Sequence, residues 1–351
     1  MIAPLRRCGS AFLALLLGTG LLIADNAAAE DVPAKALFGA KALPAEMAAN
    51  PYGFYAKGCL AGGVAIPTDG PTWQAMRLSR NRRWGHPQMI ALIEQFSHDA
   101  AEKAGWPGLL LGDISQPRGG PMLSGHASHQ IGLDADIWLT PMPQRTLTYR
   151  EREDVSATSM LQKNKFLTVD RSIRTTKHAQ LIMLAASYPQ VERVFVNPAI
   201  KKKLCDTWTG DRSALGKVRP IYGHDYHFHI RIKCPAGAAS CKDQAAVPAG
   251  DGCDKSLAWW FTDEPWAKPK KKPGEKPVKP RATTMADLPK ACALVLNGPA
   301  PASEEAATFG TAYRAPAPAV AAEGIEQVIG AAAGDVPPAD IPVPLARPTL
   351  Q

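Results

Sequence analysis

The sequence predicts an α+β fold in which a central, mostly antiparallel sheet is flanked by helices. Residues 226–232 alternate between apolar and polar side chains, as a half-buried strand does, and residues 133–139 place two aspartates on one face of a second strand. The segments 88–103 and 173–187 instead carry apolar residues at helical spacing. Because about 240 residues can bury one substantial core, a single domain is enough to hold these elements.

Short apolar runs and the residues that interrupt them indicate the other elements. Pro107 and Gly108 follow the first helix, and residues 109–114 then read as a buried strand. The remaining expected elements are a short strand within 58–67, an irregular segment at 141–170, a strand at 191–196, and short helices at 197–204 and 213–222.

The first 29 residues are typical of a cleavable signal peptide. Arg6 and Arg7 precede an apolar run at 11–23, and Ala27-Ala28-Ala29 supplies the small residues of a cleavage site. The apolar run is short for a membrane span, and no later stretch approaches transmembrane length. We therefore expect an exported protein without stable membrane insertion.

The positive charge of the chain is concentrated in one segment. The formal net charge is +8, and residues 268–281 contribute six lysines and one arginine against one glutamate. The rest of the chain is close to neutral, which argues against nucleic-acid binding by the folded body. Four prolines make 268–281 an extended linker, either a solvated spacer or a weak contact to anionic envelope polymer or membrane.

Six cysteines remain after the signal peptide: Cys59, Cys205, Cys234, Cys241, Cys253 and Cys292. An even number in an exported chain predicts disulfides, although six cysteines allow fifteen pairings. The alternative is a cysteine metal site, but no C-x2-C pair is present to support it.

Histidines cluster in two short stretches, which contain five of the eight in the chain. They are His126 and His129 in the first stretch, and His224, His227 and His229 in the second. Several imidazoles and acids gathered without a metal would leave buried polar groups unpaired. Neutral imidazole and carboxylate form the ligand set of catalytic zinc.

The expected strands explain how this set is brought together. In a strand over 226–232, His227 and His229 share one face, so one can bind a metal while the other reaches a water on it. His129 and Asp136 then complete a His, Asp, His set with an open fourth position. Asp134 shares the face of Asp136, and spacing alone does not choose between them.

Four runs carry a specific resemblance: GHASHQIGLDADIW, RVFVNPAIKKKLC, HDYHFHIRIKCP and GDGC. They resemble the penicillin-insensitive murein endopeptidases, over roughly residues 55–292. That family belongs to a group of zinc metallopeptidases with the lysostaphin-type and D-Ala-D-Ala-type peptidases and the hedgehog domain. The group is marked by H-x6-D followed by H-x-H.

The resemblance implies a role for each clustered residue. His129, Asp136 and His229 would bind Zn2+, with His126 as a candidate further ligand and Asp134 as a partner of the ligands. His227 would be the catalytic base, and His224 would stabilise the oxyanion. The family pattern also implies the disulfides Cys59–Cys292, Cys205–Cys253 and Cys234–Cys241.

The activity implied is hydrolysis of D-alanyl-meso-diaminopimelyl cross-bridges in periplasmic peptidoglycan, insensitive to penicillin. The sequence contains no G-x-S-x-G elbow and no phosphate-binding loop, which disfavours serine hydrolase and nucleotide chemistry. Two alternatives stay open: a D,D- or L,D-carboxypeptidase on murein peptides, and a non-catalytic zinc-containing wall-binding module.

The expected domain organisation follows from these motifs. It comprises a signal peptide (1–29), a lead-in (30–54), the zinc endopeptidase domain (55–266), a Pro/Lys-rich segment returning to a disulfide at Cys292 (267–296), and a disordered Ala/Pro-rich tail (297–351). Trp259, Trp260, Phe261 and Trp266 form an aromatic cluster before the linker, typical either of core or lid packing or of a carbohydrate platform.

Overall fold

The computed structural model of the 351-residue chain describes residues 32–267 and 281–310. The expected signal peptide, most of the Pro/Lys-rich linker and residues 311–351 of the expected tail lie outside the described residues. Among the residues described, no helix combines the length and the apolar character that crossing a membrane requires.

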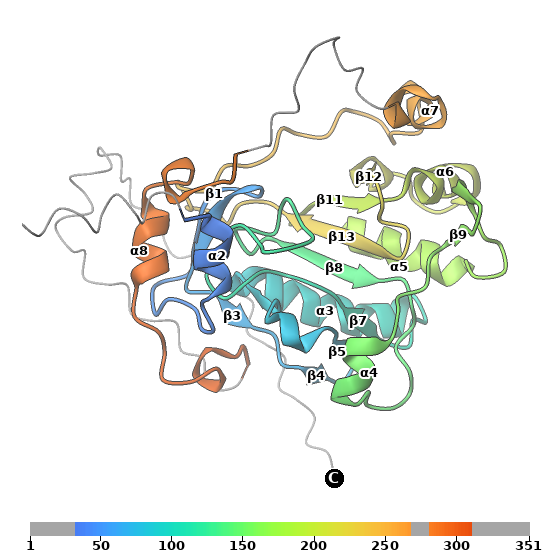
Figure 1. Cartoon of the computed structure of the whole chain (residues 1–351). Coiled ribbons are helices and arrows are strands. Elements are labelled where there is room, and N and C mark those ends of the chain that lie inside the picture. Colours follow the sequence, from blue (N-terminus) through green and yellow to red (C-terminus); the bar gives the residue numbers. More distant parts are fainter. Residues whose placement is uncertain (1–31, 268–280, 311–351) are drawn as a thin grey trace, which may run out of the picture.

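A mixed sheet of seven strands forms the centre of the described residues (Figure 1). In spatial order the strands are β12 (Val218–Pro220), β11 (Val191–Val196), β13 (His227–Ile232), β8 (Asp134–Trp138), β7 (Leu109–Leu111), β5 (Trp73–Ala75) and β4 (Asp69–Gly70). The pairs β11–β12 and β5–β7 are parallel, and the other four pairs are antiparallel. The predicted α+β fold with a mostly antiparallel sheet is confirmed.

Two helices, α3 (Pro87–Lys103) and α5 (Thr176–Ser187), cover one face of the sheet and lie behind it in Figure 1. α3 begins after His86, because the ring of His86 accepts a hydrogen bond from the backbone N–H of Gln88. The strand side chains that point toward the helices are apolar and at most 1% exposed: Ala135, Ile137, Phe228 and Ile230.

The central strands β8 and β13 set the register of the opposite face. His229 lies opposite Asp136 in the antiparallel pair, and Arg231 lies opposite Asp134. Directly paired residues point to the same side of a sheet and lie about 5 Å apart at Cβ. Alternation along the two strands therefore puts the apolar side chains in the core and gathers the polar ones on the free face.

The remaining elements lie around this sheet. They are α2 (Ala34–Gly39), β1 (Asn50–Phe54), β2 (Lys57–Ala61), β3 (Val64–Ala65), β6 (Trp84–Gly85), α4 (Tyr149–Asp154), β9 (Leu161–Gln162), β10 (Lys165–Val169), α6 (Pro198–Thr207), α7 (Lys255–Ala258) and α8 (Ala291–Asn297). Short 3-10 helices η1 to η6 lie at Leu78–Arg80, Leu215–Lys217, Trp259–Phe261, Glu264–Trp266, Met285–Asp287 and Glu305–Ala307.

Two expected segments differ in detail from the sequence prediction. The segment 141–170, expected to be irregular, contains the capped helix α4 and the hairpin of β9 and β10. The segment 213–222, expected to be helical, contains only the short helix η2 before β12 pairs with β11. Val218–Pro220 instead pairs in parallel with Val194–Val196 of β11, because this segment carries no apolar pattern strong enough to favour a helix.

Disulfides and a folded-back chain end brace the domain. The structure pairs Cys59 with Cys292, Cys205 with Cys253 and Cys234 with Cys241, which are the pairs that the resemblance implies. Residues 297–310, included in the expected disordered tail, lie on the body, where Thr308 forms a β-bridge with Ala65. The N-terminal and C-terminal parts of the described chain therefore pack together at one end of the molecule (Figure 1).

Candidate metal centre

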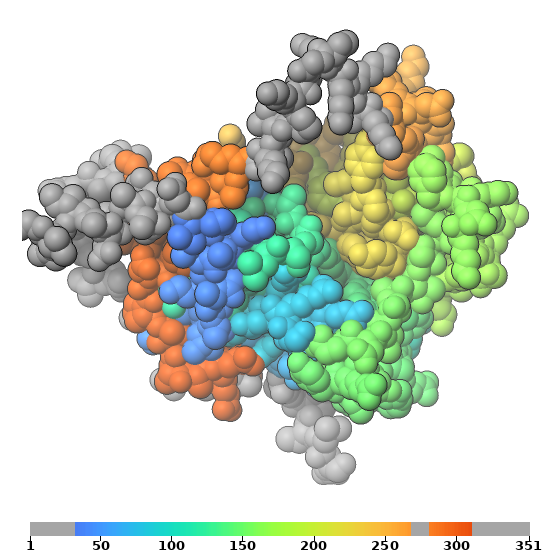
Figure 2. Space-filling model, in the orientation of Figure 1, coloured from blue at the N-terminus to red at the C-terminus, as the bar shows by residue number. Residues whose placement is uncertain are grey.

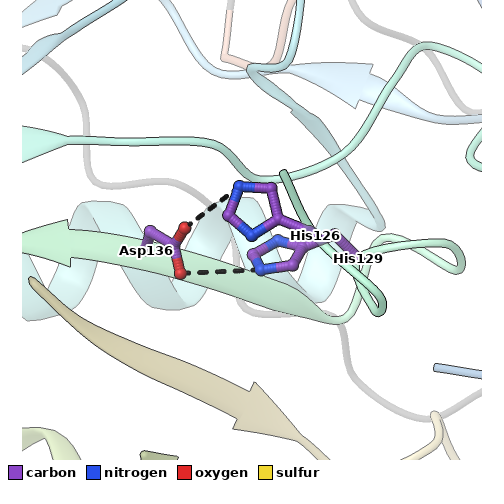
Figure 3. A group of neighbouring side chains, drawn as sticks. All are labelled: His126, His129 and Asp136. Atoms are coloured by element: carbon purple, nitrogen blue, oxygen red, sulfur yellow. Dashed lines mark ion pairs between the residues drawn. The ribbon is translucent and has the colours of Figure 1, made fainter. Parts of the chain in front are cut away.

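Two histidines of one loop and one aspartate of the central sheet meet on the free face (Figure 3). His126 and His129 lie in the loop between β7 and β8, and Asp136 is the third residue of β8. Each offers one ligand atom, and these atoms lie within 4.8 Å of one another. Nε2 of His129 is 3.5 Å from Oδ1 of Asp136, and Nε2 of His126 is 3.5 Å from Oδ2.

Strand β13 brings two more imidazoles to the same carboxylate. Nε2 of His227 lies 3.5 Å from Oδ1 of Asp136, and Nδ1 of His229 lies 3.6 Å from it. The ring of His229 is also 4.5 Å from the ring of His129, centre to centre. The group whose ligand atoms all lie within 4.8 Å of one another contains His126 and not His229. Four imidazoles nevertheless lie around Asp136, and three of them, His126, His129 and His229, are candidate ligands.

His224 lies beside His227 at the edge of this cluster. Their ring centres are 4.7 Å apart, and Nδ1 of His224 lies 2.8 Å from the carbonyl oxygen of Tyr222. His224 and His129 both have a left-handed backbone, with φ of 53° and 67°. This conformation costs a residue with a Cβ about 1–2 kcal/mol, and such positions concentrate at functional sites.

Two atoms at the centre of the cluster are buried without a hydrogen-bond partner among the described residues. They are Nε2 of His129 and Oδ1 of Asp136. Buried polar atoms are normally paired, and an unpaired one costs about 1–3 kcal/mol. A metal ion would satisfy both, because imidazole nitrogen and carboxylate oxygen are ligands that zinc takes. The residues present therefore fit a metal.

Hydrogen bonds orient two of the imidazoles toward Asp136. Nδ1 of His129 donates to the carbonyl of Ile114 at 2.7 Å, which leaves the lone pair on Nε2. Nε2 of His229 donates to Oδ1 of Asp134 at 2.7 Å, which leaves the lone pair on Nδ1. Metal-binding histidines are commonly fixed through their second nitrogen in this way.

The chain matches a known family over the region that contains this site. The description of the matching family is penicillin-insensitive murein endopeptidase, and the match covers residues 51–297. The chain belongs to this family. A protein of Haemophilus influenzae named penicillin-insensitive murein endopeptidase is 45% identical over 257 residues, which are 72% of this chain and 84% of the relative. A Klebsiella pneumoniae protein of the same name is 40% identical over 249 residues, which are 71% and 86% of the two chains. The family resemblance predicted from the sequence is thus confirmed.

The structure of this murein endopeptidase family member also shows which contacts Asp134 makes. Asp134 is fully buried and accepts hydrogen bonds from the ring of His229, the guanidinium of Arg231 and the backbone N–H of His129. Burial raises the pKa of Asp134, but Arg231 and His229 outweigh it and hold that pKa well below its usual range. Its oxygens are therefore directed to partners, whereas Oδ1 of Asp136 is unpaired.

The imidazoles of the site differ in their proton affinity. Burial lowers the pKa of His129, but Asp136 and Asp134 outweigh it and raise that pKa to about 9. Without a metal ion Nε2 of His129 is therefore protonated near pH 7, and a bound metal ion would take the place of that proton. Burial lowers the pKa of His227 below its usual value despite the nearby Asp136. His227 is therefore neutral near pH 7 and has a lone pair available to accept a proton.

One carboxylate of the site was not singled out in the sequence. Oδ2 of Asp113 lies 3.0 Å from Nε2 of His126 and 2.9 Å from the guanidinium of Arg82. Burial raises the pKa of Asp113, but its contacts with His126 and Arg82 outweigh burial and lower it to about 2. The available signal was an aspartate two residues after the end of the buried strand β7, which adjoins β8.

Proposed function

We propose that the protein is a zinc-dependent murein endopeptidase that hydrolyses D-alanyl-meso-diaminopimelyl cross-bridges of peptidoglycan in the periplasm. The observation that carries this proposal is the unpaired Oδ1 of Asp136, around which three imidazoles converge at 3.5–3.6 Å. Family membership supports the substrate, because the relatives are named murein endopeptidases.

In this proposal His129, Asp136 and His229 hold the zinc ion, and His126 is a candidate further ligand. The fixed lone pairs on Nε2 of His129 and Nδ1 of His229 support this set. Zinc in such a site supplies Lewis acidity, which lowers the pKa of water to about 7 and polarises a carbonyl group.

The protein side chains move the protons. Neutral His227 takes the proton of the attacking water on its Nε2 and then gives it to the leaving amine of the cross-bridge. In this proposal His224 stabilises the oxyanion. Because Nδ1 faces the carbonyl of Tyr222, it would act through Nε2, which must carry a proton for this role although burial lowers the pKa of His224. The backbone carbonyl thereby fixes the ring of His224 beside His227.

The decisive experiment combines metal content with digestion of purified dimeric muropeptides by the same preparation. We expect about one zinc ion per chain and conversion of each dimer into two monomers. We also expect a chelator to stop the reaction and added zinc to restore it. Release of a single free amino acid would instead identify a carboxypeptidase, and a zinc-loaded protein without hydrolysis would identify a binding module.

A further inference from the structure

Aromatic side chains from separate segments gather beside the metal centre. We call this group the aromatic wall; it consists of Phe166, Tyr222, Trp259, Trp260 and Trp266. Phe166 lies on β10, Tyr222 precedes β13, and the three tryptophans lie on η3 and η4. Phe166 is 55% exposed, Tyr222 49% and Trp259 38%.

The aromatic wall is held in place by contacts among its own members. The ring of Tyr222 meets Trp260 and Trp266 edge to face, at centre distances of 4.9 and 5.2 Å. Its hydroxyl donates to the carbonyl of Pro265, and Nε1 of Trp266 donates to the carbonyl of Trp260 at 2.9 Å. Phe166 packs edge to face on Trp266 at 4.7 Å. The rings are therefore fixed in position before any ligand arrives.

Core packing does not account for this arrangement. None of the five rings belongs to a buried apolar cluster of the described residues. Exposed aromatic side chains that adjoin one another mark a binding surface more often than singly exposed aromatic side chains do. The packed lid, one of the two interpretations of this sequence cluster, would require these rings to cover apolar neighbours.

The aromatic wall is continuous with the metal centre. The carbonyl of Tyr222 receives the hydrogen bond from Nδ1 of His224, and the ring of His224 lies 4.7 Å from that of His227. Tyr226, 42% exposed, continues the aromatic surface at 4.6 Å from His227. In Figure 2 the yellow surface of residues near 225 borders a hollow whose other side is cyan and teal, from residues near 80 and 125.

We propose that the aromatic wall binds a sugar ring of the glycan strand from which the scissile peptide extends. This inference rests on the proposed function and adds the carbohydrate part of the substrate to it. A pyranose ring has an apolar face of C–H groups, which stacks on the electron-rich face of an aromatic ring. Alanyl and diaminopimelyl residues of the cross-bridge offer no such face, so the rings complement the sugar.

The charges next to the aromatic wall favour a glycan over a lipid surface. Exposed Asp263 and Glu264 lie three and two residues before Trp266, and exposed Lys163 and Lys165 lie on either side of Asn164, next to Phe166. These charges are mixed, so the described part of the wall is not the uniformly basic surface that anionic lipid headgroups attract, whereas the neutral N-acetylhexosamine units of a glycan strand need no such surface. Binding to an anionic membrane is the alternative that the experiment must distinguish, because the basic segment 268–281 follows in the sequence.

The test compares two forms of one cross-linked dimer, with its disaccharides and after enzymatic removal of the sugars. For the wild type we expect a lower KM for the sugar-bearing dimer. The KM for the sugar-free dimer divided by the KM for the sugar-bearing dimer measures the contribution of the sugar. Phe166→Ala and Trp266→Ala should reduce this ratio about two- to tenfold. Tyr149→Ala is the matched control, because Tyr149 is 60% exposed on α4 and outside the aromatic wall; it should keep the wild-type ratio.

A direct binding measurement separates this proposal from the proposed function. Titration with N-acetylglucosamine oligomers should change the tryptophan fluorescence of the wild type, and more weakly that of Phe166→Ala, whether or not the protein hydrolyses murein. Phe166→Ala removes an exposed side chain of β10, so it keeps the test valid if Trp266→Ala does not fold. Equal KM ratios in all proteins, no fluorescence response to sugar, or binding of anionic vesicles in its place would overturn the proposal.

Discussion

At the scale of single residues, one oxygen atom defines the site. Oδ1 of Asp136 faces His129, His227 and His229 at nearly equal distances, yet these three imidazoles have different surroundings. His129 and His229 each have their second nitrogen tied to the protein. His227 has no such tie among the hydrogen bonds of the described residues, which suits its proposed role as a general base, a group that changes its protonation during each turnover.

Replacing His227 by alanine separates proton transfer from metal binding. We expect His227→Ala to retain zinc, because the three proposed ligands are unchanged, and to lower kcat by about 10²–10⁴-fold, the usual contribution of a general base. Zinc analysis and muropeptide kinetics on one preparation measure both properties. Full activity in a zinc-loaded His227→Ala protein would contradict the assignment.

Asp134 should affect zinc affinity without touching the ion. Asp134→Asn removes the negative charge that orients His229 and neutralises the buried Arg231. We expect zinc affinity to fall about 10- to 100-fold, as for other partners of metal-binding histidines, measured by competition with a chromophoric chelator. Asp99→Asn, at a carboxylate of α3 that accepts from Tyr188, is the control and should keep wild-type affinity. Equal affinities in the two variants would show that Asp134 does not orient His229.

The sequence could predict the histidines and Asp136 but not how the second nitrogen of each ring is used. Spacing left Asp134 and Asp136 equivalent, because both lie on one face of one strand. The family resemblance favoured Asp136, and the register, with Arg231 opposite Asp134, explains why the oxygens of Asp134 are already bonded. Asp113 was missed for a similar reason, since its contact with His126 depends on how the loop between β7 and β8 folds back.

At the scale of elements, periodicity predicted β8, β13, α3 and α5 well, because each buries one face against a neighbour. It could not predict strand order, which depends on contacts between residues far apart in sequence. It also missed the hairpin of β9 and β10, whose short strands contain only half-buried and exposed residues and carry little apolar alternation.

Helix α3 provides a pH-dependent test of the fold. Burial lowers the pKa of its capping residue His86 to about 4, from 6.5. Between these values the unfolded chain binds a proton that the folded protein does not, so stability falls as pH decreases from 6.5 toward 4. The loss from this group is up to about 3 kcal/mol.

His86→Asn keeps a residue that caps helices well and removes the titration. Denaturant unfolding at several pH values should therefore show a smaller loss of stability in His86→Asn than in the wild type between pH 6.5 and 4. The other histidines contribute equally to both proteins and cancel in the comparison. Parallel pH profiles would contradict a buried, neutral His86.

At the scale of the whole molecule, the chain end folds back onto the lead-in. Buried Arg118 joins these regions by donating to backbone carbonyls of Leu43, Pro44, Val295, Leu296 and Gly298. Apart from the expected return to Cys292, this contact could not be predicted from the sequence, because the Ala/Pro-rich composition resembles that of a disordered tail. Residues 297–310 are nevertheless held on the body, because Gly298 accepts from Arg118, Glu304 pairs with Arg83, and the backbone N–H of Phe309 donates to the carbonyl of Ala65.

The disulfides should differ in their contribution to stability. Cys59–Cys292 joins residues 233 apart in sequence, whereas Cys234–Cys241 joins residues 7 apart. A cross-link stabilises mainly by restricting the unfolded chain, so removing the first pair should lower the free energy of unfolding by about 5 kcal/mol and removing the second by about 2–3 kcal/mol. Double serine variants compared by denaturant unfolding measure this difference. Both variants should bind zinc while folded, because none of the proposed ligands is a cysteine: they lie in the loop before β8, on β8 and on β13. Equal losses of stability would show that local strain, not chain entropy, dominates.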